Sequence, residues 1–169
     1  MDLEKLIDPF PVKKEAKIIA QTIANNPENL AQLWKLCLSD KKHSWRASWL
    51  LDKVYEISPH LVRPLIPQMV LLIPQLNDTS KMRQFLKLIS LESLPNNISG
   101  EFITTCFELL ISKKSAIAVK VYAMQILFNF SRQEPDIKNE LAIIIEEGIK
   151  NESGGYCSRA CKILKALHR

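Results

Sequence analysis

The sequence repeats itself with a period of 37 residues. Shifted by this period, three successive segments align without gaps from their first positions, Pro27, Pro64 and Glu101. Apolar residues then share columns, which are Leu33/Val70/Phe107, Leu36/Ile73/Leu110, Trp45/Met82/Val119, Trp49/Leu86/Ala123 and Val54/Leu91/Phe128. A basic column is formed by Arg46, Arg83 and Lys120. A period of this length is typical of arrays whose units bury their apolar faces against each other. The repeat therefore predicts a fold built by stacking one small unit.

Each unit is expected to contain two helices. Asn26 can cap the first helix of the first unit, with Pro27 at the first helical position, where its missing N–H has no helical partner to lose. Residues 133–136 (Gln-Glu-Pro-Asp) give a similar start to a fourth, looser unit. Polar breaks at 39–42, 77–80, 112–114 and 151–155 separate the two helices of each unit. The second helices are predicted at 44–57, 80–91, 115–130 and 155–167.

The repeat also predicts the domain organisation. We expect one domain over residues 1–169, because a chain of this length is ordinary for a single domain. An irregular pair of helices at 2–7 and 13–25, split by Pro9 and Pro11, is expected to form a cap over residues 1–26. The predicted repeats span 27–63, 64–100, 101–134 and 135–169.

The two-helix unit of 37 residues resembles the HEAT repeat, in which an acidic or amide residue precedes a basic residue by six positions. Asp40/Arg46 and Asn77/Arg83 match this spacing, Ser153/Arg159 is a weak echo, and Lys114/Lys120 departs from it. The resemblance covers residues 27–169 and extends to short bacterial HEAT-like proteins of unassigned function. It implies an all-α fold, a right-handed α–α superhelix (an armadillo-type α-solenoid) of about five helix pairs. It also implies that some residues tie neighbouring repeats together, namely Asp40, Arg46, Asn77, Arg83 and Arg159.

Composition excludes several classes of protein. Apolar residues make up 47% of the chain and charged residues 24%, which is a globular rather than a disordered composition. The start lacks the order of a signal peptide, and the most apolar stretch, residues 64–76, is shorter than the roughly 20 residues that span a bilayer. Four cysteines without an export signal indicate reduced thiols. We therefore expect a cytoplasmic protein that does not bind membranes.

The net charge of +5 is spread thinly along the chain, and no unit exceeds +2. Lysines concentrate at the breaks between helices, and stacking would bring them to one edge as a discontinuous basic ridge; they are Lys41, Lys42, Lys81, Lys113 and Lys114. The ridge is either a solvated loop edge or an attraction for an anionic partner. Lys120 has no acidic residue six positions before it, so it is freer for another role. The arginines of the basic column could likewise contact phosphate, although a tie between repeats is the stronger interpretation.

Trp45, Trp49 and Asp52 lie on one stripe of a predicted helix. An aromatic pair beside a carboxylate could hold a cation by cation–π attraction. The alternative is packing between adjacent helices, and it is favoured because both tryptophan columns stay apolar in the other repeats. Asp52 does not fit this pattern, since Ile89 and Ile126 occupy its column. A buried carboxylate at this position would need a partner.

No catalytic or metal-binding template is present. The chain has no phosphate-binding loop, dinucleotide fingerprint or nucleophile motif, and its histidines lie near helix breaks or the chain end. Cys157, Cys161 and His168 share one helix face, but a zinc site commonly needs four ligands from separate segments. We therefore expect no catalytic residues, no metal and no small-molecule cofactor.

Three functions are compatible with these patterns. The leading one is a scaffold that binds a protein partner, with candidate contacts at Lys41, Lys42, Trp45, Trp49, Asp52, Lys81, Lys113, Lys114 and Lys120. The second is nucleic-acid binding, including an activity similar to the HEAT-like DNA glycosylases for alkylated bases, which would use Trp45 or Trp49, Asp52 and Arg83. The third is a metabolic enzyme such as adenylosuccinate lyase, which similar short proteins carry as a label. True lyases are longer and use a mobile Gly- and Ser-rich loop, whereas Gly154–Gly155 begins a predicted helix.

Overall fold

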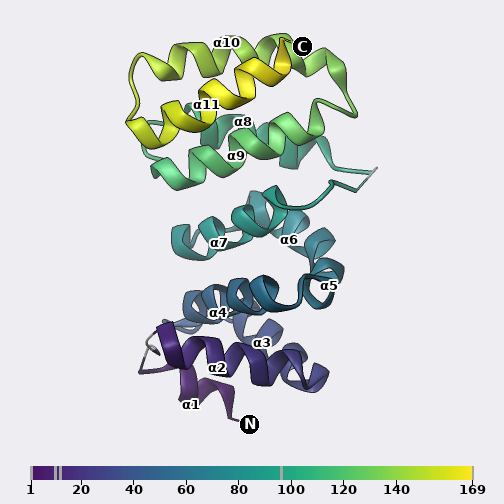
Figure 1. The fold of residues 1–169 in the computed structure, drawn as a ribbon, viewed down its shortest axis with the longest axis vertical. Helices are drawn as coiled ribbons and strands as arrows, with labels where there is room; N and C mark the ends of the chain where they lie inside the picture. Colours follow the sequence, from purple (N-terminus) through teal and green to yellow (C-terminus); the bar gives the residue numbers. More distant parts are fainter. Residues whose placement is uncertain (1, 10, 12, 96, 169) are drawn as a thin grey trace. The chain divides into compact units, whose positions relative to one another are not determined.

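The computed structural model describes residues 2–9, 11, 13–95 and 97–168. Helices joined by loops follow one another along the chain (Figure 1), and no strand occurs among the described residues. The α-helices are α1 (Leu3–Ile7), α2 (Lys13–Ala24), α3 (Pro27–Leu38), α4 (Ser44–Ile57), α5 (Pro59–Val62), α6 (Ile66–Leu72), α7 (Thr79–Ser90), α8 (Gly100–Ile111), α9 (Ile117–Phe130), α10 (Lys138–Ile149) and α11 (Gly154–Leu167). Short 3-10 helices are η1 (Arg63–Leu65), η2 (Ile73–Gln75) and η3 (Pro135–Ile137). The predicted all-α fold is confirmed.

Contacts divide the chain into two units, Met1–Pro67 with Leu76–Leu88, and Gln68–Gln75 with Ile89–Arg169. In the first unit, α4 packs against both α2 and α3. Its core contains Leu33, Leu50 and Leu51, all fully buried, and the rings of Trp34 and Phe85 lie 5.6 Å apart. The prediction of one domain over the whole chain, and that of a right-handed superhelix, stay predictions.

In the second unit, α9 packs against α8 and α11, and α10 packs against α11. The core between these helices includes Phe102, Met124, Leu127 and Ile145, which are fully buried, and Tyr156, which is 1% exposed. Each helix pair thus covers the apolar face of the next within the unit, as the repeat predicts.

The second repeat differs from its predicted start. The first helical segment begins at Pro59 rather than near Pro64, and it is broken into α5, η1, α6 and η2. Pro64, Pro67 and Pro74 lie along this segment. A proline inside a helix removes a backbone donor and its ring crowds the preceding turn, so a continuous α-helix is disfavoured here. The 3-10 turn η3 begins at Pro135, and the regular helix α10 starts three residues later.

Helix starts follow the capping chemistry in part. Asn26 has the extended backbone of a cap and Pro27 is the first residue of α3, as expected, but the Asn26 side chain donates to the Thr22 carbonyl at 2.9 Å instead of capping. Asp78 caps α7, since its Oδ1 accepts hydrogen bonds from the backbone of Ser80 and Lys81, both at 2.9 Å.

Among the described residues, no helix has both the length and the apolar character to cross a membrane.

Candidate functional site

The stripe that contains both tryptophans and Asp52 lies on α4. Trp45 and Trp49 are half-buried, whereas Asp52 is only 2% exposed. The Arg46 guanidinium lies 5.7 Å from the ring centre of Trp45. The residues that share the column of Trp49, Leu86 and Ala123, are fully buried. Packing therefore accounts for this column in the other repeats but leaves part of Trp49 on the surface.

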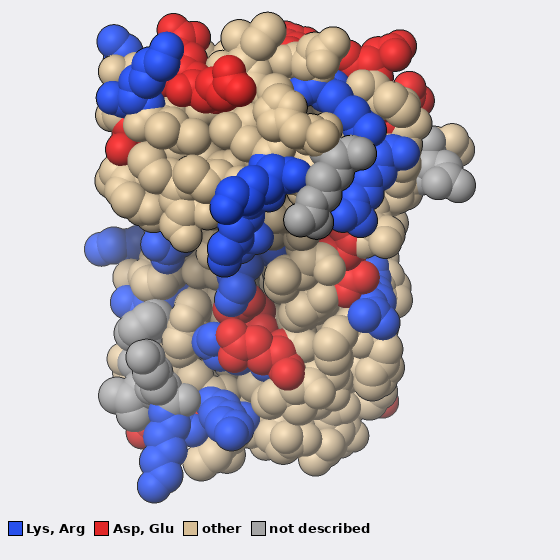
Figure 2. Space-filling model, turned by 45° about the horizontal axis from the view of Figure 1, so that its top comes forward, with Lys and Arg blue, Asp and Glu red and all other residues tan. Residues whose placement is uncertain are grey.

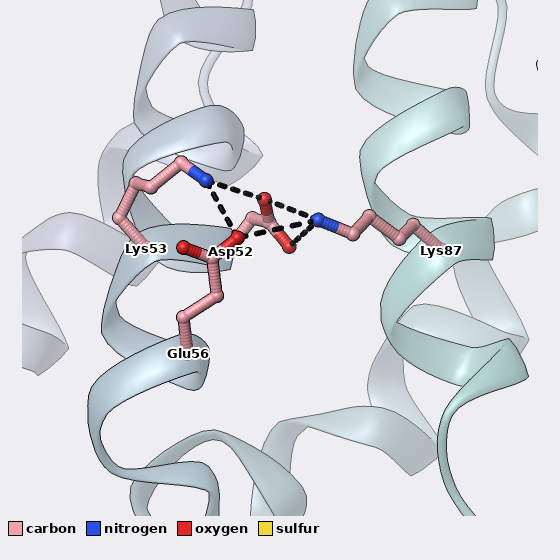
Figure 3. Close-up of polar contacts among 4 residues, drawn as sticks. All are labelled: Asp52, Lys53, Glu56 and Lys87. Carbon is pink, nitrogen blue, oxygen red and sulfur yellow. Dashed lines mark hydrogen bonds and ion pairs between the residues drawn. The ribbon is translucent and has the colours of Figure 1, made fainter. Parts of the chain in front are cut away.

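Asp52 is buried in an ion-pair cluster of four residues (Figure 3). Lys87 of α7 places its Nζ 2.7 Å from both carboxylate oxygens of Asp52, with a hydrogen bond to Oδ2. The Nζ of Lys53 lies 3.5 Å from Asp52 Oδ2 and 2.6 Å from Glu56 Oε1. The second contact of Lys87, to Glu56 Oε1, is 3.6 Å long. The carboxylate that broke the apolar column is thus buried with the cationic partner that its burial requires.

Glu56 completes the cluster at the surface. Its partial burial alone would raise the pKa of the carboxyl group, but hydrogen bonds and charge from Lys53 and Lys87 together hold that pKa below its ordinary value of 4.5. Glu56 is therefore ionised at neutral pH. Its carboxylates face lysines within one unit of the protein rather than standing open to an incoming cation.

A surface pocket of about 510 Å³ lies beside this cluster, and we call it the α2–α4 pocket. Its lining residues are Lys17 of α2 and Trp49, Lys53, Glu56 and Ile57 of α4. Trp49 and Ile57 are half-buried and supply an apolar wall, while charged groups surround it. The sequence places Trp49 and Glu56 on one helix stripe, but it does not indicate Lys17, Lys53 or Ile57, because no column of the repeat marks the space between two helices.

Arg46 and Lys81 each connect neighbouring helix pairs of the first unit. Arg46 donates from Nη1 to the carbonyl oxygens of Ile7, at 3.2 Å, and Asp8 at the end of α1. Lys81 is 6% exposed and donates to the Ser39 carbonyl at 3.1 Å. Arg46 thus links α4 to backbone carbonyls at the end of α1, and Asp40 is exposed.

Arg83 and Asn77 do not take the places expected of them. Both are exposed, and the tie of this repeat is made by Lys81, two residues before Arg83. Asp78 caps the start of α7 through the backbone N–H of Lys81, and the Lys81 side chain contacts Ser39. Arg159 is exposed and donates to Gln125 Oε1 at 2.9 Å, so it links α11 to α9.

Lys120 also differs from its expected role. Expected to be free for a partner, it is 3% exposed, and its Nζ forms an ion pair with Glu152 in the loop between α10 and α11. A second surface pocket, of about 680 Å³, adjoins this pair. Its lining residues are Leu110, Ile111, Lys113, Lys120, Ile144, Glu147, Gly148, Asn151, Glu152 and Tyr156. The missing acidic residue six positions before Lys120 is replaced by one from the following repeat.

The lysines of the predicted ridge fall into both units, so the ridge stays a prediction. Within the first unit, Lys41 forms an ion pair with Glu4, and Lys42 is exposed beside it. Lys81, being buried, presents no charge at that surface. Lys113 and Lys114 in the second unit are exposed. Figure 2 shows that Lys and Arg side chains on the face it displays are interspersed with acidic and uncharged residues.

The cysteines form no metal cluster in the part of the chain that is described. No group of three or more His, Cys, Asp and Glu residues there could hold a metal ion. Cys157 lies near the carbonyls of Ile149 and Glu152, with Sγ at 3.7 and 3.6 Å, and Cys161 is exposed. Burial raises the pKa of the Cys37 thiol to about 12 and raises that of Cys106 as well, so both thiols are poor nucleophiles.

Comparison with known proteins agrees with this architecture. A family model described as the HEAT repeat domain matches residues 4–167. The match therefore includes the N-terminal helices that the repeat register assigns to a cap. Neither a curated protein nor a solved structure matches the chain.

Proposed function

This chain belongs to the HEAT repeat family, and we propose that it is a helical-repeat scaffold that binds a protein partner. Repeat scaffolds expose the helices of successive units side by side, which gives an extended surface for a second protein. The observation that carries the proposal is a pocket in each unit that combines a bulky apolar wall with a charged rim. Trp49 and Ile57 form the wall in one unit, and Ile111 and Ile144 form it in the other. Protein interfaces have the same make-up, an apolar centre with a polar rim.

The ion-pair cluster supports binding rather than catalysis. A glycosylase-like reaction would need a carboxylate open to the substrate, but Asp52 is 2% exposed and engaged by Lys87. Lys120 is likewise occupied by Glu152. We propose that neither residue is catalytic. Nucleic-acid binding and a lyase activity have no specific structural observation in their favour, and the cytoplasmic location stays a prediction.

The proposal is tested by capture followed by reconstitution. The immobilised chain should retain a protein from the source lysate, and the same protein, purified, should form a complex of fixed stoichiometry in size-exclusion chromatography with light scattering. A gel shift at about 50 mM salt, where phosphate contacts are strongest, tests the alternative. The proposal is wrong if no purified candidate forms a complex while DNA or RNA is bound at that salt concentration. Failure to release fumarate from adenylosuccinate would exclude the lyase activity.

A further inference from the structure

We propose that the α2–α4 pocket binds an acidic peptide segment of the partner, one that carries a bulky apolar side chain among its carboxylates. The inference rests on the proposed scaffold function and adds to it the surface used and the chemistry recognised. The pocket lies wholly within the first unit, between α2 and α4, which pack directly on each other.

The apolar side chain of the segment is expected to lie against Trp49. This tryptophan is half-buried although its repeat equivalents, Leu86 and Ala123, are fully buried, so the repeat itself does not require a ring of this size at the surface. Ile57 extends the wall of the pocket, and Ile18 on α2, next to Lys17, is 62% exposed. A half-buried aromatic ring beside aliphatic groups is a common anchor in protein interfaces, because a partner gains apolar burial there at little conformational cost.

The charge of the pocket favours carboxylates. Asp52 and Glu56 are both contacted by Lys53 and Lys87, so these four charges compensate one another. Lys17 is exposed, and the structure gives it no ion-pair partner among the described residues. One positive charge therefore remains uncompensated at the rim, and Lys14 lies exposed one turn earlier on α2. A basic segment would be repelled by Lys17, and both carboxylates of the cluster already face lysines.

A nucleic acid fits the pocket less well. Double-stranded DNA carries about one charge per 1.7 Å of its axis, and tight binding draws on several phosphate contacts at once. The pocket offers one uncompensated lysine. On the face in Figure 2, basic side chains lie in small groups among acidic and uncharged residues. A short peptide with a few carboxylates and an apolar anchor matches both the size and the charge of the site.

The test is selection of peptides on the purified full chain from a randomised 12-residue library displayed on phage. Enriched peptides are expected to combine Asp or Glu with Leu, Phe or Trp. Their affinity, measured by fluorescence anisotropy, should fall by about tenfold in Lys17→Glu and in Trp49→Ala, a loss of about 1.4 kcal/mol. Lys14→Glu is the matched control, because Lys14 is exposed on the same helix but does not line the pocket. It should change affinity by less than about threefold, as expected of a charge outside the contact.

The proposal is overturned if the selected peptides are basic or show no charge preference, if no peptide is enriched, or if Lys17→Glu binds them as tightly as the unaltered chain. It is also overturned if a single-stranded or duplex oligonucleotide displaces the selected peptides and Lys17→Glu weakens binding of the oligonucleotide as much as binding of the peptides. Circular dichroism of each variant shows whether it is folded, and Lys17→Glu serves as the deciding variant because its side chain is exposed. A partner that binds the unaltered chain and Lys17→Glu alike would leave the scaffold function in place and refute the pocket alone.

Discussion

Each of the two units buries one member of an ion pair, but the sign of that buried member differs. In the first unit the buried group is a carboxylate, Asp52, whose partners Lys53 and Lys87 have side chains 26% and 28% exposed. In the second unit the buried group is an amine, Lys120, with a side chain 4% exposed and one ion-pair partner among the described residues, Glu152. Within a unit, a second helix can therefore be tied to the neighbouring repeat either by a redundant cluster or by a single ion pair.

The number of ion-pair partners decides how much stability is lost when one partner is removed. A buried charge left without its counter-charge costs about 3–5 kcal/mol, because the desolvation of the ion is no longer offset. Asp52 keeps one lysine when the other is removed, and both lysines can reach solvent. Lys120 keeps no acidic partner when Glu152 is removed. The second unit should therefore be the more sensitive of the two to the loss of one charge.

The largest effect is expected for Glu152→Gln. The substitution leaves the ammonium of Lys120 buried beside a neutral amide, so unfolding free energy should fall by about 3 kcal/mol. Urea denaturation followed by circular dichroism measures this change. Tryptophan fluorescence is followed in parallel and reports only the first unit, since all three tryptophans lie there. The loss caused by Glu152→Gln, which lies in the second unit, should therefore appear in circular dichroism.

Lys120→Met combined with Glu152→Gln is the control for this pair. Removing both charges should recover much of the lost stability, since an apolar group of similar shape can replace a buried ion pair at little cost. A double variant as unstable as Glu152→Gln would show that the loop around Glu152, rather than the buried charge, is responsible.

A slightly smaller effect in the same unit is expected for Gly148→Ala. A Cβ at this position would lie 2.2 Å from the hydroxyl oxygen of Tyr156 and 2.6 Å from its Cζ. Tyr156 is 1% exposed, so its ring has little room to move, and overpacking of this kind costs about 1–3 kcal/mol. Gly154→Ala is the matched control, because a Cβ there meets nothing within 4 Å. Equal stability of the two variants would mean that α10 and α11 can move apart to accommodate the added Cβ. Close packing of these helices would then not be what holds Glu152 in place.

The architecture was predictable from the sequence because the repeat reports it directly. The second helix of the first repeat runs from Ser44 to Ile57, as predicted, and Pro27 begins α3. Periodicity of apolar residues and capping chemistry are local properties, so they can be read without knowing the fold. The broken first helix of the second repeat was missed because proline spacing, rather than the repeat register, determines where it starts.

The site was less predictable because its key contacts join residues far apart in the sequence. Asp52 was recognised as needing a partner, but nothing in the sequence identifies Lys87, 35 residues later, as that partner. Lys81, which the sequence places at a break between helices, and Lys120, which the sequence leaves free for a partner, are both buried in the structure. The exposure of a lysine depends on which face of its helix it occupies, and the sequence alone does not identify the face that packs against a neighbour.

The redundancy of the first unit is tested by Lys87→Met. Asp52 would keep Lys53, whose Nζ is 3.5 Å from Oδ2 and can approach further, so a loss of about 1–2 kcal/mol is expected, below that of a fully stranded buried charge. Lys53→Met should lower the unfolding free energy by less, because Lys87 makes the shorter contacts with Asp52. The double variant should lose more than the sum of the single losses, since only then is Asp52 without a lysine. Additive losses measured in the same urea assay would show that the two lysines do not substitute for one another.

The smallest expected effect is the pH dependence contributed by Glu56, which belongs to the cluster but is half exposed. The folded state lowers the pKa of this carboxyl group below 4.5, so ionised Glu56 stabilises the fold above that pH. This contribution is lost as the pH falls through the folded-state pKa, because protonation removes the attraction to Lys53 and Lys87. Glu56→Gln should therefore be less stable than the unaltered chain by under about 1 kcal/mol at pH 7, the range of exposed ion pairs, and the gap should close towards pH 3. Thermal unfolding at pH 7, 5, 4 and 3 measures the gap, with Glu15→Gln, an exposed carboxylate of α2 outside the cluster, as a comparison. A gap that stays constant with pH would mean that Glu56 supports the cluster through packing of its side chain and not through its charge, and the buried Asp52 would then account alone for the electrostatic tie between α4 and α7.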